Sequence, residues 1–206
     1  MREDKIRRIG LATYALPEAE MERTIFSRVQ EGEPLKNIMP KLGEDRLHSV
    51  IEGMLLELGS LYGYLTYTAD RTQSFNNRLL GDIASFREVP CFASPSDVKV
   101  AENIDVIWFR KRATVPMPKL TFDVEITSDF SKALHRAYQL RDFNITLYVV
   151  APEERREIFQ RRFQREPYHQ LGDRMVFRTT EDISQLYEAA IRYFDVKERV
   201  LTDPSL

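Results

Sequence analysis

The segment that most constrains the fold is residues 145–151, whose sequence ITLYVVA is apolar along almost its whole length. A run of this length that is rich in β-branched residues predicts a strand. The run does not alternate between apolar and polar residues, so the strand is expected to be buried on both faces. Such a strand lies in the middle of a sheet with helices on either side, and the chain is therefore predicted to fold around a covered β-sheet.

The segments on either side of this strand alternate between helical and strand patterns. The clearest is a stripe of apolar residues at helical spacing over residues 46–61, which predicts an amphipathic helix. The predicted elements that follow it are strands at 64–69, 103–109 and 120–127, a helix ending at 143, the buried strand, a helix at 152–164, a strand at 174–180 and a helix at 182–194. This order predicts an α/β protein with a mixed β-sheet flanked by helices.

Residues 1–45 are predicted to form a small N-terminal helical segment, and residues 46–206 the main domain. Met21, Ile25 and Val29 recur at helical spacing, and a turn at residues 31–34 separates them from a short second helix. Two helices joined by a tight turn resemble a helix-turn-helix, but we favour a helical arm packed on the main domain.

The composition excludes several classes of protein. The chain has 206 residues, of which 43% are hydrophobic, so it can bury a substantial core. Charged residues make up 30%, but the net charge is only −2, which excludes a basic nucleic-acid arm and a disordered acidic tail. No window approaches the roughly 18 consecutive apolar residues of a membrane span.

The cysteine and histidines of the sequence indicate neither a disulfide framework nor a zinc site. Cys91 is the one cysteine, so the chain forms no internal disulfide, which fits a reducing compartment. The first ten residues are too polar for a secretion signal, and we expect a cytoplasmic protein. The three histidines, His48, His135 and His169, are scattered and show no zinc-site spacing.

Acidic residues interrupt two of the predicted strands. Side chains alternate along a strand, so Asp123 and Glu125 share the polar face of the strand at 120–127. Taken alone, this pattern also fits an edge strand with a solvated polar face. Asp105 lies in the otherwise apolar strand at 103–109, and a hairpin between the two strands would bring it opposite these acids. Three converging carboxylates repel, so at least one pKa rises unless a cation lies among them.

Hard carboxylate oxygens held on strands suit Mg²⁺ or Mn²⁺, and such an ion stabilises the charge that develops when a phosphodiester is displaced. The next helix supplies two cations and an amide, because Lys132, Arg136 and Gln139 at i, i+4 and i+7 share one face. This face fits contacts with a phosphate backbone. The alternative is an ordinary solvated face that pairs with Asp129 and Asp142.

Residues 46–151 resemble the PD-(D/E)XK superfamily, the restriction-endonuclease-like nucleases that include restriction enzymes, Holliday-junction resolvases and repair exonucleases. The resemblance lies in the segments IDVIW, FDVEIT, RAYQL and LYVVAP, and in the order helix, three strands, helix, strand. It implies a restriction-endonuclease-like fold with an αβββαβ core. It also implies a Mg²⁺- or Mn²⁺-dependent deoxyribonuclease, a restriction- or repair-type endonuclease that hydrolyses DNA phosphodiester bonds.

The resemblance assigns the site residue by residue and leaves two alignments open. Asp105 matches the motif aspartate, which is a metal ligand. In one alignment Glu125 is the motif acid and Thr127 stands at the lysine position, so that Lys132 would supply the missing charge. In the other, Asp123 is the motif acid and Glu125 stands at the lysine position. Both alignments keep Asp105 and Glu125 in the site.

The helices of the superfamily imply further site residues. Gln139 resembles the helix glutamine of several members, and with Arg136 it is predicted to contact nucleic acid. Many members also place a metal-binding acid on the first core helix. Glu57 is our choice for this ligand, and Glu52 is the alternative.

The absent motif lysine leaves a second interpretation open, a catalytically inactive nuclease-like module that binds nucleic acid or a partner protein. A third is a hydrolase that acts on nucleotides or sugar phosphates. DNA is the partner that the resemblance implies. Many members cut both strands as dimers, so a homodimer is a further expectation, as is assembly with a partner protein or as part of a longer chain.

Overall fold

The computed structural model describes residues 7–11, 13–15, 24–112 and 115–201. Within them a five-stranded sheet has the order β3-β6-β7-β8-β9. The strands are β3 (Leu65–Thr68), β6 (Val106–Arg112), β7 (Val115–Val124), β8 (Thr146–Ala151) and β9 (Met175–Thr179). The pairs β3–β6 and β6–β7 are antiparallel, and the pairs β7–β8 and β8–β9 are parallel, so the sheet is mixed as predicted.

Strand β8 confirms the prediction made from its apolar run. It lies between β7 and β9, and Val149 and Val150 are both fully buried. They belong to different hydrophobic clusters, because successive side chains point to opposite faces of the sheet. Helices therefore cover both faces.

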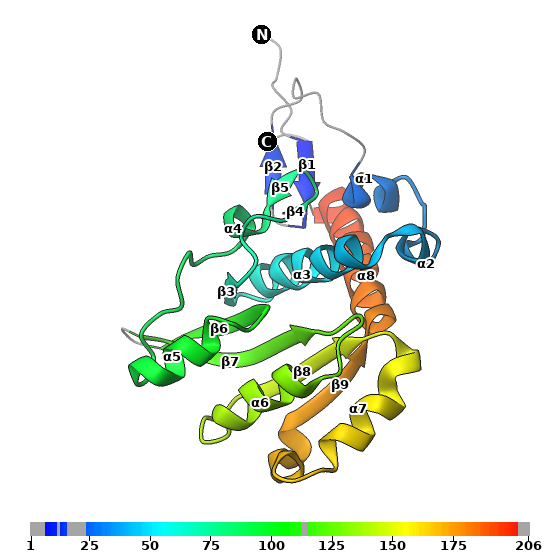
Figure 1. Ribbon diagram of the computed structural model, residues 1–206. Helices are drawn as coiled ribbons and strands as arrows, with labels where there is room; N and C mark the ends of the chain where they lie inside the picture. The colour runs from blue at the N-terminus through cyan, green and yellow to red at the C-terminus, as the bar shows by residue number, and fades with distance from the viewer. Residues whose placement is uncertain (1–6, 12, 16–23, 113–114, 202–206) are drawn as a thin grey trace.

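The two helical layers are visible in Figure 1. Helices α3 (Glu44–Leu61) and α8 (Thr180–Leu201) share one hydrophobic cluster with Trp108, Phe122 and Val150 of the sheet. Helices α6 (Ser131–Gln139) and α7 (Arg156–Phe163) share a second cluster with Leu147 and Val149, while α5 (Pro95–Ala101) packs beside β6. The order α3, β3, β6, β7, α6, β8 confirms the predicted αβββαβ core.

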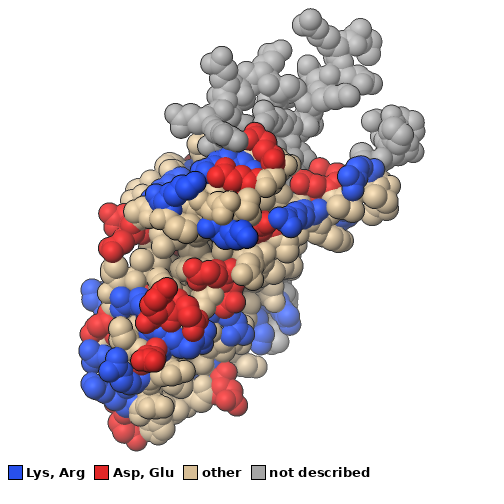
Figure 2. All heavy atoms as spheres, turned by 90° about the vertical axis from the view of Figure 1, so that its right-hand side faces the viewer, with Lys and Arg blue, Asp and Glu red and all other residues tan. Residues whose placement is uncertain are grey.

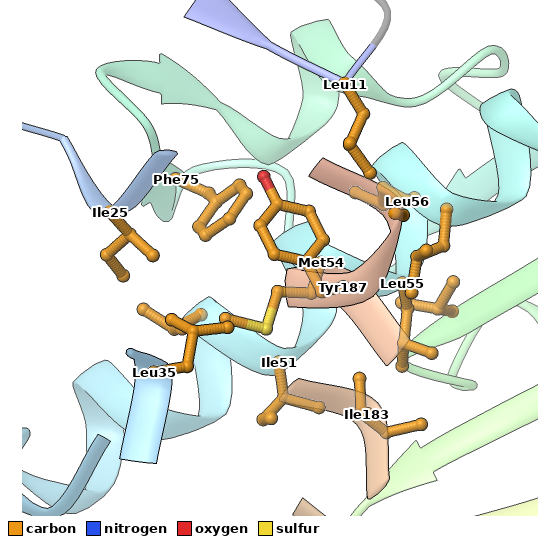
Figure 3. Packing of buried hydrophobic residues seen from close by; sticks show 14 of the residues in the cluster. Leu11, Ile25, Leu35, Ile51, Met54, Leu55, Leu56, Phe75, Ile183 and Tyr187 are labelled. Carbon is orange, nitrogen blue, oxygen red and sulfur yellow. The ribbon is translucent and has the colours of Figure 1, made fainter. Parts of the chain in front are cut away.

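The core between α3 and α8 also includes the N-terminal region (Figure 3). Helix α1 (Ile25–Gln30) begins at a capping box formed by Thr24 and Ser27. It is followed by α2 (Leu35–Ile38) and the short 3-10 helix η1 (Met39–Lys41). The apolar side chains of α1 and α2 lie in the same cluster as Met54 of α3 and Tyr187 of α8.

The predicted N-terminal helical segment is confirmed by α1 and α2, but within it residues 7–11 and 13–15 are not helical. They form a two-stranded hairpin of β1 (Arg7–Gly10) and β2 (Thr13–Ala15). Helix α1 begins at Ile25, and Met21, which was expected in it, lies outside the described residues.

Several boundaries differ from the predicted ones. Strand β7 starts at Val115 and runs through a segment that was expected to be a connection, because β6 and β7 form a long hairpin. It ends at Val124, so Glu125 lies directly after the strand. Helix α6 ends at Gln139 rather than at residue 143, and α8 is longer than predicted at both ends.

The remaining elements are short and lie in connections. Between β3 and β6 the chain forms a small hairpin and one turn of helix, and two 3-10 helices flank α7. The hairpin strands, the helical turn and the two 3-10 helices are, in chain order, β4 (Ser74–Phe75), β5 (Arg78–Leu79), α4 (Leu80–Ile83), η2 (Glu153–Arg155) and η3 (Tyr168–Arg174). Among the helices of the described residues, none combines the length and apolar character that a bilayer crossing requires.

Candidate metal centre

The three predicted acids lie at one end of the β6–β7 hairpin. Residue Val106 pairs with Phe122, so Asp105, directly before β6, lies beside the end of β7 where Asp123 and Glu125 are. The backbone N–H of Val124 donates a hydrogen bond of 2.6 Å to Oδ2 of Asp105. Figure 2 shows the side of the molecule toward which β7 runs, where acidic side chains gather between groups of Lys and Arg.

Helix α6 covers the polar face of β7. Strand β7 is third of the five strands, so its polar face is not that of a solvated edge strand. Asp123 is only 3% exposed, and Nε of Arg136 donates a hydrogen bond of 3.0 Å to its Oδ1. Nη2 of Arg136 also lies 3.9 Å from Oε1 of Glu125. One half-buried guanidinium therefore binds Asp123 and lies beside the carboxylate of Glu125.

The electrostatics match those expected for converging acids. Burial raises the pKa of Asp123 to about 8, with repulsion from Asp105 and Glu125 adding to this effect and Arg136 opposing it. Burial also raises the pKa of Glu125 to about 7, and the charge of Asp105 acts in the same direction. The arrangement therefore carries more negative charge than Arg136 alone balances.

Helix α3 adds Glu52 and His48 to this cluster. His48 lies between two carboxylates, with Nδ1 3.5 Å from Oε2 of Glu52 and Nε2 3.5 Å from Oδ2 of Asp105. One ligand atom from each of the three side chains lies within 4.8 Å of the others. Glu52 and His48 are four residues apart, so one face of α3 presents both toward Asp105.

The pKa values of these two groups follow from their contacts. Burial lowers the pKa of His48, but the two carboxylates on either side of it, Asp105 and Glu52, outweigh this effect and raise the pKa to about 10. Burial raises the pKa of Glu52 to about 7, although His48 opposes the increase. The ionised carboxylate of Glu52 is thus destabilised in its site.

The donor set fits a cation. Glu52 is 0% exposed, and neither of its oxygens has a hydrogen-bond partner among the described residues. A buried carboxylate without such partners is costly unless a positive charge compensates it. Protonated His48 provides this charge in the metal-free protein, and a divalent ion bound between Glu52 and Asp105 would replace it.

The structure does not bring Glu57 to this cluster. Residues five positions apart on an α-helix are separated by about 140° around its axis, so Glu52 and Glu57 face different sides of α3. Glu57 accepts hydrogen bonds from Oη of Tyr187 at 2.5 Å and from the N–H of Leu11 at 3.2 Å. Glu52, the alternative of the two helix acids, is the one that lies beside Asp105.

The predicted residues of α6 fall into two groups. Arg136 is half-buried and contacts Asp123, whereas Lys132 and Gln139 are exposed. Thr127, at the lysine position of one alignment, is also exposed and lies beyond β7. The cation beside the acids is therefore Arg136 rather than Lys132.

Sequence reasoning missed His48, which was judged only as one of three scattered histidines. The signal that was available is its i, i+4 spacing from Glu52 on the first core helix. Sequence reasoning also missed two residues that surround Glu125. The Ser128 hydroxyl donates a hydrogen bond to Glu125, and Arg155 donates one to the carbonyl oxygen of Ser128.

A family model described as the type II restriction enzyme NmeDI C-terminal domain matches residues 30–202. The matched region contains the helix α3, the whole five-stranded sheet and the candidate metal centre. No curated protein and no solved structure matches the chain. The finer assignment to the PD-(D/E)XK superfamily stays a prediction.

Proposed function

Because the chain belongs to the family of the type II restriction enzyme NmeDI C-terminal domain, we propose that it is a metal-dependent nuclease that hydrolyses DNA phosphodiester bonds. The observation that carries this proposal is the fully buried carboxylate of Glu52, which lies with His48 and Asp105 in one cluster of ligand atoms. A nuclease of this kind requires a divalent ion close to several carboxylates, and this part of the structure offers them.

In this proposal Asp105 and Glu52 hold the ion, and Glu125 lies next to it at the end of β7. Bound Mg²⁺ or Mn²⁺ supplies a water of lowered pKa and offsets charge on the scissile phosphate. The backbone N–H of Val124 fixes the carboxylate of Asp105, and Ser128 fixes that of Glu125. The ligands are thus oriented before DNA arrives.

Helix α6 has two roles in the proposed site. Arg136 holds Asp123 and Glu125 in position through its guanidinium. Lys132 and Gln139 are exposed on the same helix, and they contact the DNA backbone. Lys132 stabilises charge on the phosphate in place of the missing motif lysine.

A second function, a nuclease-like module that binds nucleic acid or protein without cleaving, is favoured by one observation. Arg136 already pairs with Asp123, so the cation nearest the acids is engaged in a structural ion pair. With Lys132 exposed, no lysine among the described residues contacts the acids. This function predicts DNA or protein binding that does not depend on a metal ion.

The test is incubation of supercoiled, linear and single-stranded DNA with the protein and either Mg²⁺ or Mn²⁺. The site variant is Asp105→Ala/Glu125→Ala, and the matched control is Asp173→Ala/Glu157→Ala, which removes two exposed acids. Metal-dependent cleavage that the site variant loses and the control keeps supports the nuclease. Intact DNA in every reaction, together with DNA binding that is unchanged by EDTA, supports the inactive module.

A further inference from the structure

We propose that His48 is a ligand of the metal ion and that its imidazole makes the centre prefer Mn²⁺ to Mg²⁺. This inference rests on the proposed function, because it concerns the same site. It adds a nitrogen ligand to a centre for which the sequence predicted carboxylates alone.

The geometry places His48 within reach of the same ion as Asp105 and Glu52. Ligand atoms about 2.1 Å from one ion are about 3 Å apart when adjacent and about 4.2 Å apart when opposite. The ligand atoms of the three side chains lie within 4.8 Å of one another, and His48 is 3.5 Å from each carboxylate. Small side-chain adjustments bring them around one ion, and the imidazole of His48 releases its proton to solvent as the ion binds.

The environment of the cluster independently indicates a cation. Both oxygens of Glu52 are buried and have no hydrogen-bond partner among the residues that the structure describes. Asp105 is anchored by the N–H of Val124, and Glu52 and His48 are fixed on consecutive turns of α3. The three ligands therefore come from α3 and from the residue next to β6, and both positions are held by regular structure, as a preformed ion site requires.

The ligand chemistry determines the preference. Imidazole suits transition metals, whereas Mg²⁺ selects carboxylates, carbonyls and water in near-octahedral geometry. Two carboxylates and one imidazole thus favour Mn²⁺ over Mg²⁺. Carboxylates suit both ions, and the imidazole is the ligand that Mg²⁺ accepts less readily, so replacing it lowers Mn²⁺ affinity more than Mg²⁺ affinity.

The experiment measures ion binding to the full chain without DNA. Mn²⁺ and Mg²⁺ affinities are determined by calorimetry for the wild type, for His48→Gln and for His169→Gln. His169 is a matched control because it also lies beside one glutamate, with Nδ1 3.3 Å from Oε2 of Glu166, but that pair is exposed. For His48→Gln we expect about a tenfold loss of Mn²⁺ affinity and about a twofold loss or less for Mg²⁺. His169→Gln leaves both affinities unchanged.

Pulsed electron paramagnetic resonance gives a direct readout of the ligand. Mn²⁺ bound to the wild type shows coupling to an imidazole ¹⁴N nucleus, and His48→Gln and His48→Asn lose it. Circular dichroism shows whether each variant is folded. Bound Mn²⁺ without nitrogen coupling, or equal losses for Mn²⁺ and Mg²⁺, would overturn the inference.

The outcomes also separate this inference from the proposed nuclease function. If DNA is cleaved with Mn²⁺ but no nitrogen coupling is present, the role of His48 fails and the nuclease stands. If the wild type binds neither ion at millimolar concentration, both fail together.

Discussion

At the scale of single residues, two glutamates of one helix illustrate how position decides role. Glu52 and Glu57 are both buried on α3, and neither has a lysine or arginine in an ion pair among the described residues. Glu52 lies beside Asp105 and pairs with His48, whereas Oε2 of Glu57 accepts hydrogen bonds from Tyr187 and Leu11. The first is suited to bind an ion, and the second is a structural group in the core.

This contrast predicts opposite results for the same substitution. Glu52→Gln removes a charged ligand, so we expect the affinity for Mn²⁺ to fall by at least about tenfold. Glu57→Gln leaves the metal centre intact, so its affinity stays within about twofold of that of the wild type. Calorimetric titration with Mn²⁺ checks both variants, and equal losses would contradict the assignment of Glu52.

A pH dependence of stability is expected for Glu57. Burial raises its pKa, although Tyr187 and Leu11 oppose the increase, so the folded protein holds a proton that the unfolded chain has already released. The unfolding free energy contributed by this group is therefore fully present below the ordinary glutamate pKa. It is lost as pH rises through the raised pKa of the folded state.

Glu57→Gln abolishes this contribution. The unfolding free energy of the wild type, relative to that of the variant, should decrease as pH rises from about 4.5 toward neutrality. Urea unfolding across this pH range is the measurement. A difference that stays constant or increases with pH would show that Glu57 is ionised throughout.

At the scale of elements, the ion pair between α6 and β7 links the site to the packing of the sheet. Arg136 and Asp123 are 18% and 5% exposed in their side chains, so removing either leaves a buried charge without its partner. Lys132 lies one turn earlier on the same helix and is exposed.

Arg136→Met is therefore expected to lower the unfolding free energy by about 3–5 kcal/mol, whereas Lys132→Met changes it by about 0.5 kcal/mol or less. Urea unfolding at about pH 9, above the raised pKa of Asp123, measures both. The double variant Asp123→Asn/Arg136→Met should recover part of the loss, because no unpaired charge remains. Equal stability of the two single variants would show that the pair is not structural.

Helix α3 also makes a close contact that depends on glycine. A Cβ added at Gly53 would lie 2.2 Å from Cγ of Phe75, closer than any real contact. Alanine favours a helix by about 1 kcal/mol over glycine, but displacing a packed ring costs about 1–3 kcal/mol.

We therefore expect Gly53→Ala to destabilise the protein, even though the substitution favours the helix. Ser60→Ala, at a half-buried position of the same helix, is the control and should change the unfolding free energy by about 0.5 kcal/mol or less. Thermal unfolding of both variants is the measurement, and a Gly53→Ala variant more stable than the wild type would contradict the close contact.

At the scale of the whole molecule, the N-terminal segment and the sheet domain share one core. Phe26 of α1 is 1% exposed and belongs to the cluster that contains α3 and α8. Because α3 also carries Glu52 and His48, loss of this packing affects the helix that forms the candidate centre. We expect the described residues to unfold as one cooperative unit.

Phe26→Ala should lower the unfolding free energy by about 3–5 kcal/mol, whereas Asn37→Ala, an exposed change in α2, should have little effect. Far-ultraviolet circular dichroism and the fluorescence of Trp108 should report coincident transitions. Two separate transitions would indicate that the N-terminal segment folds independently.

The sequence by itself determined the order of elements and the acids on the strands. The strand β8 and the helix α3 were predictable because each shows a local pattern of apolar residues. The period of that pattern indicates whether the segment buries its apolar residues as a helix or as a strand. Asp105, Asp123 and Glu125 were found because acids within apolar strands are costly without a reason. The hairpin β1–β2 was not found, because its pairing depends on contacts outside its own short segment.

Only the tertiary structure decided which residues accompany these acids. The choice between Glu52 and Glu57 depends on how α3 is rotated against the sheet, and periodicity does not specify which residue faces a strand end. The approach of His48 to Asp105 joins residues 57 positions apart, and the pairing of Arg136 with Asp123 depends on how α6 lies over β7. Spacing along the chain predicts which residues share a face, whereas the residues that meet across elements are determined by packing in three dimensions.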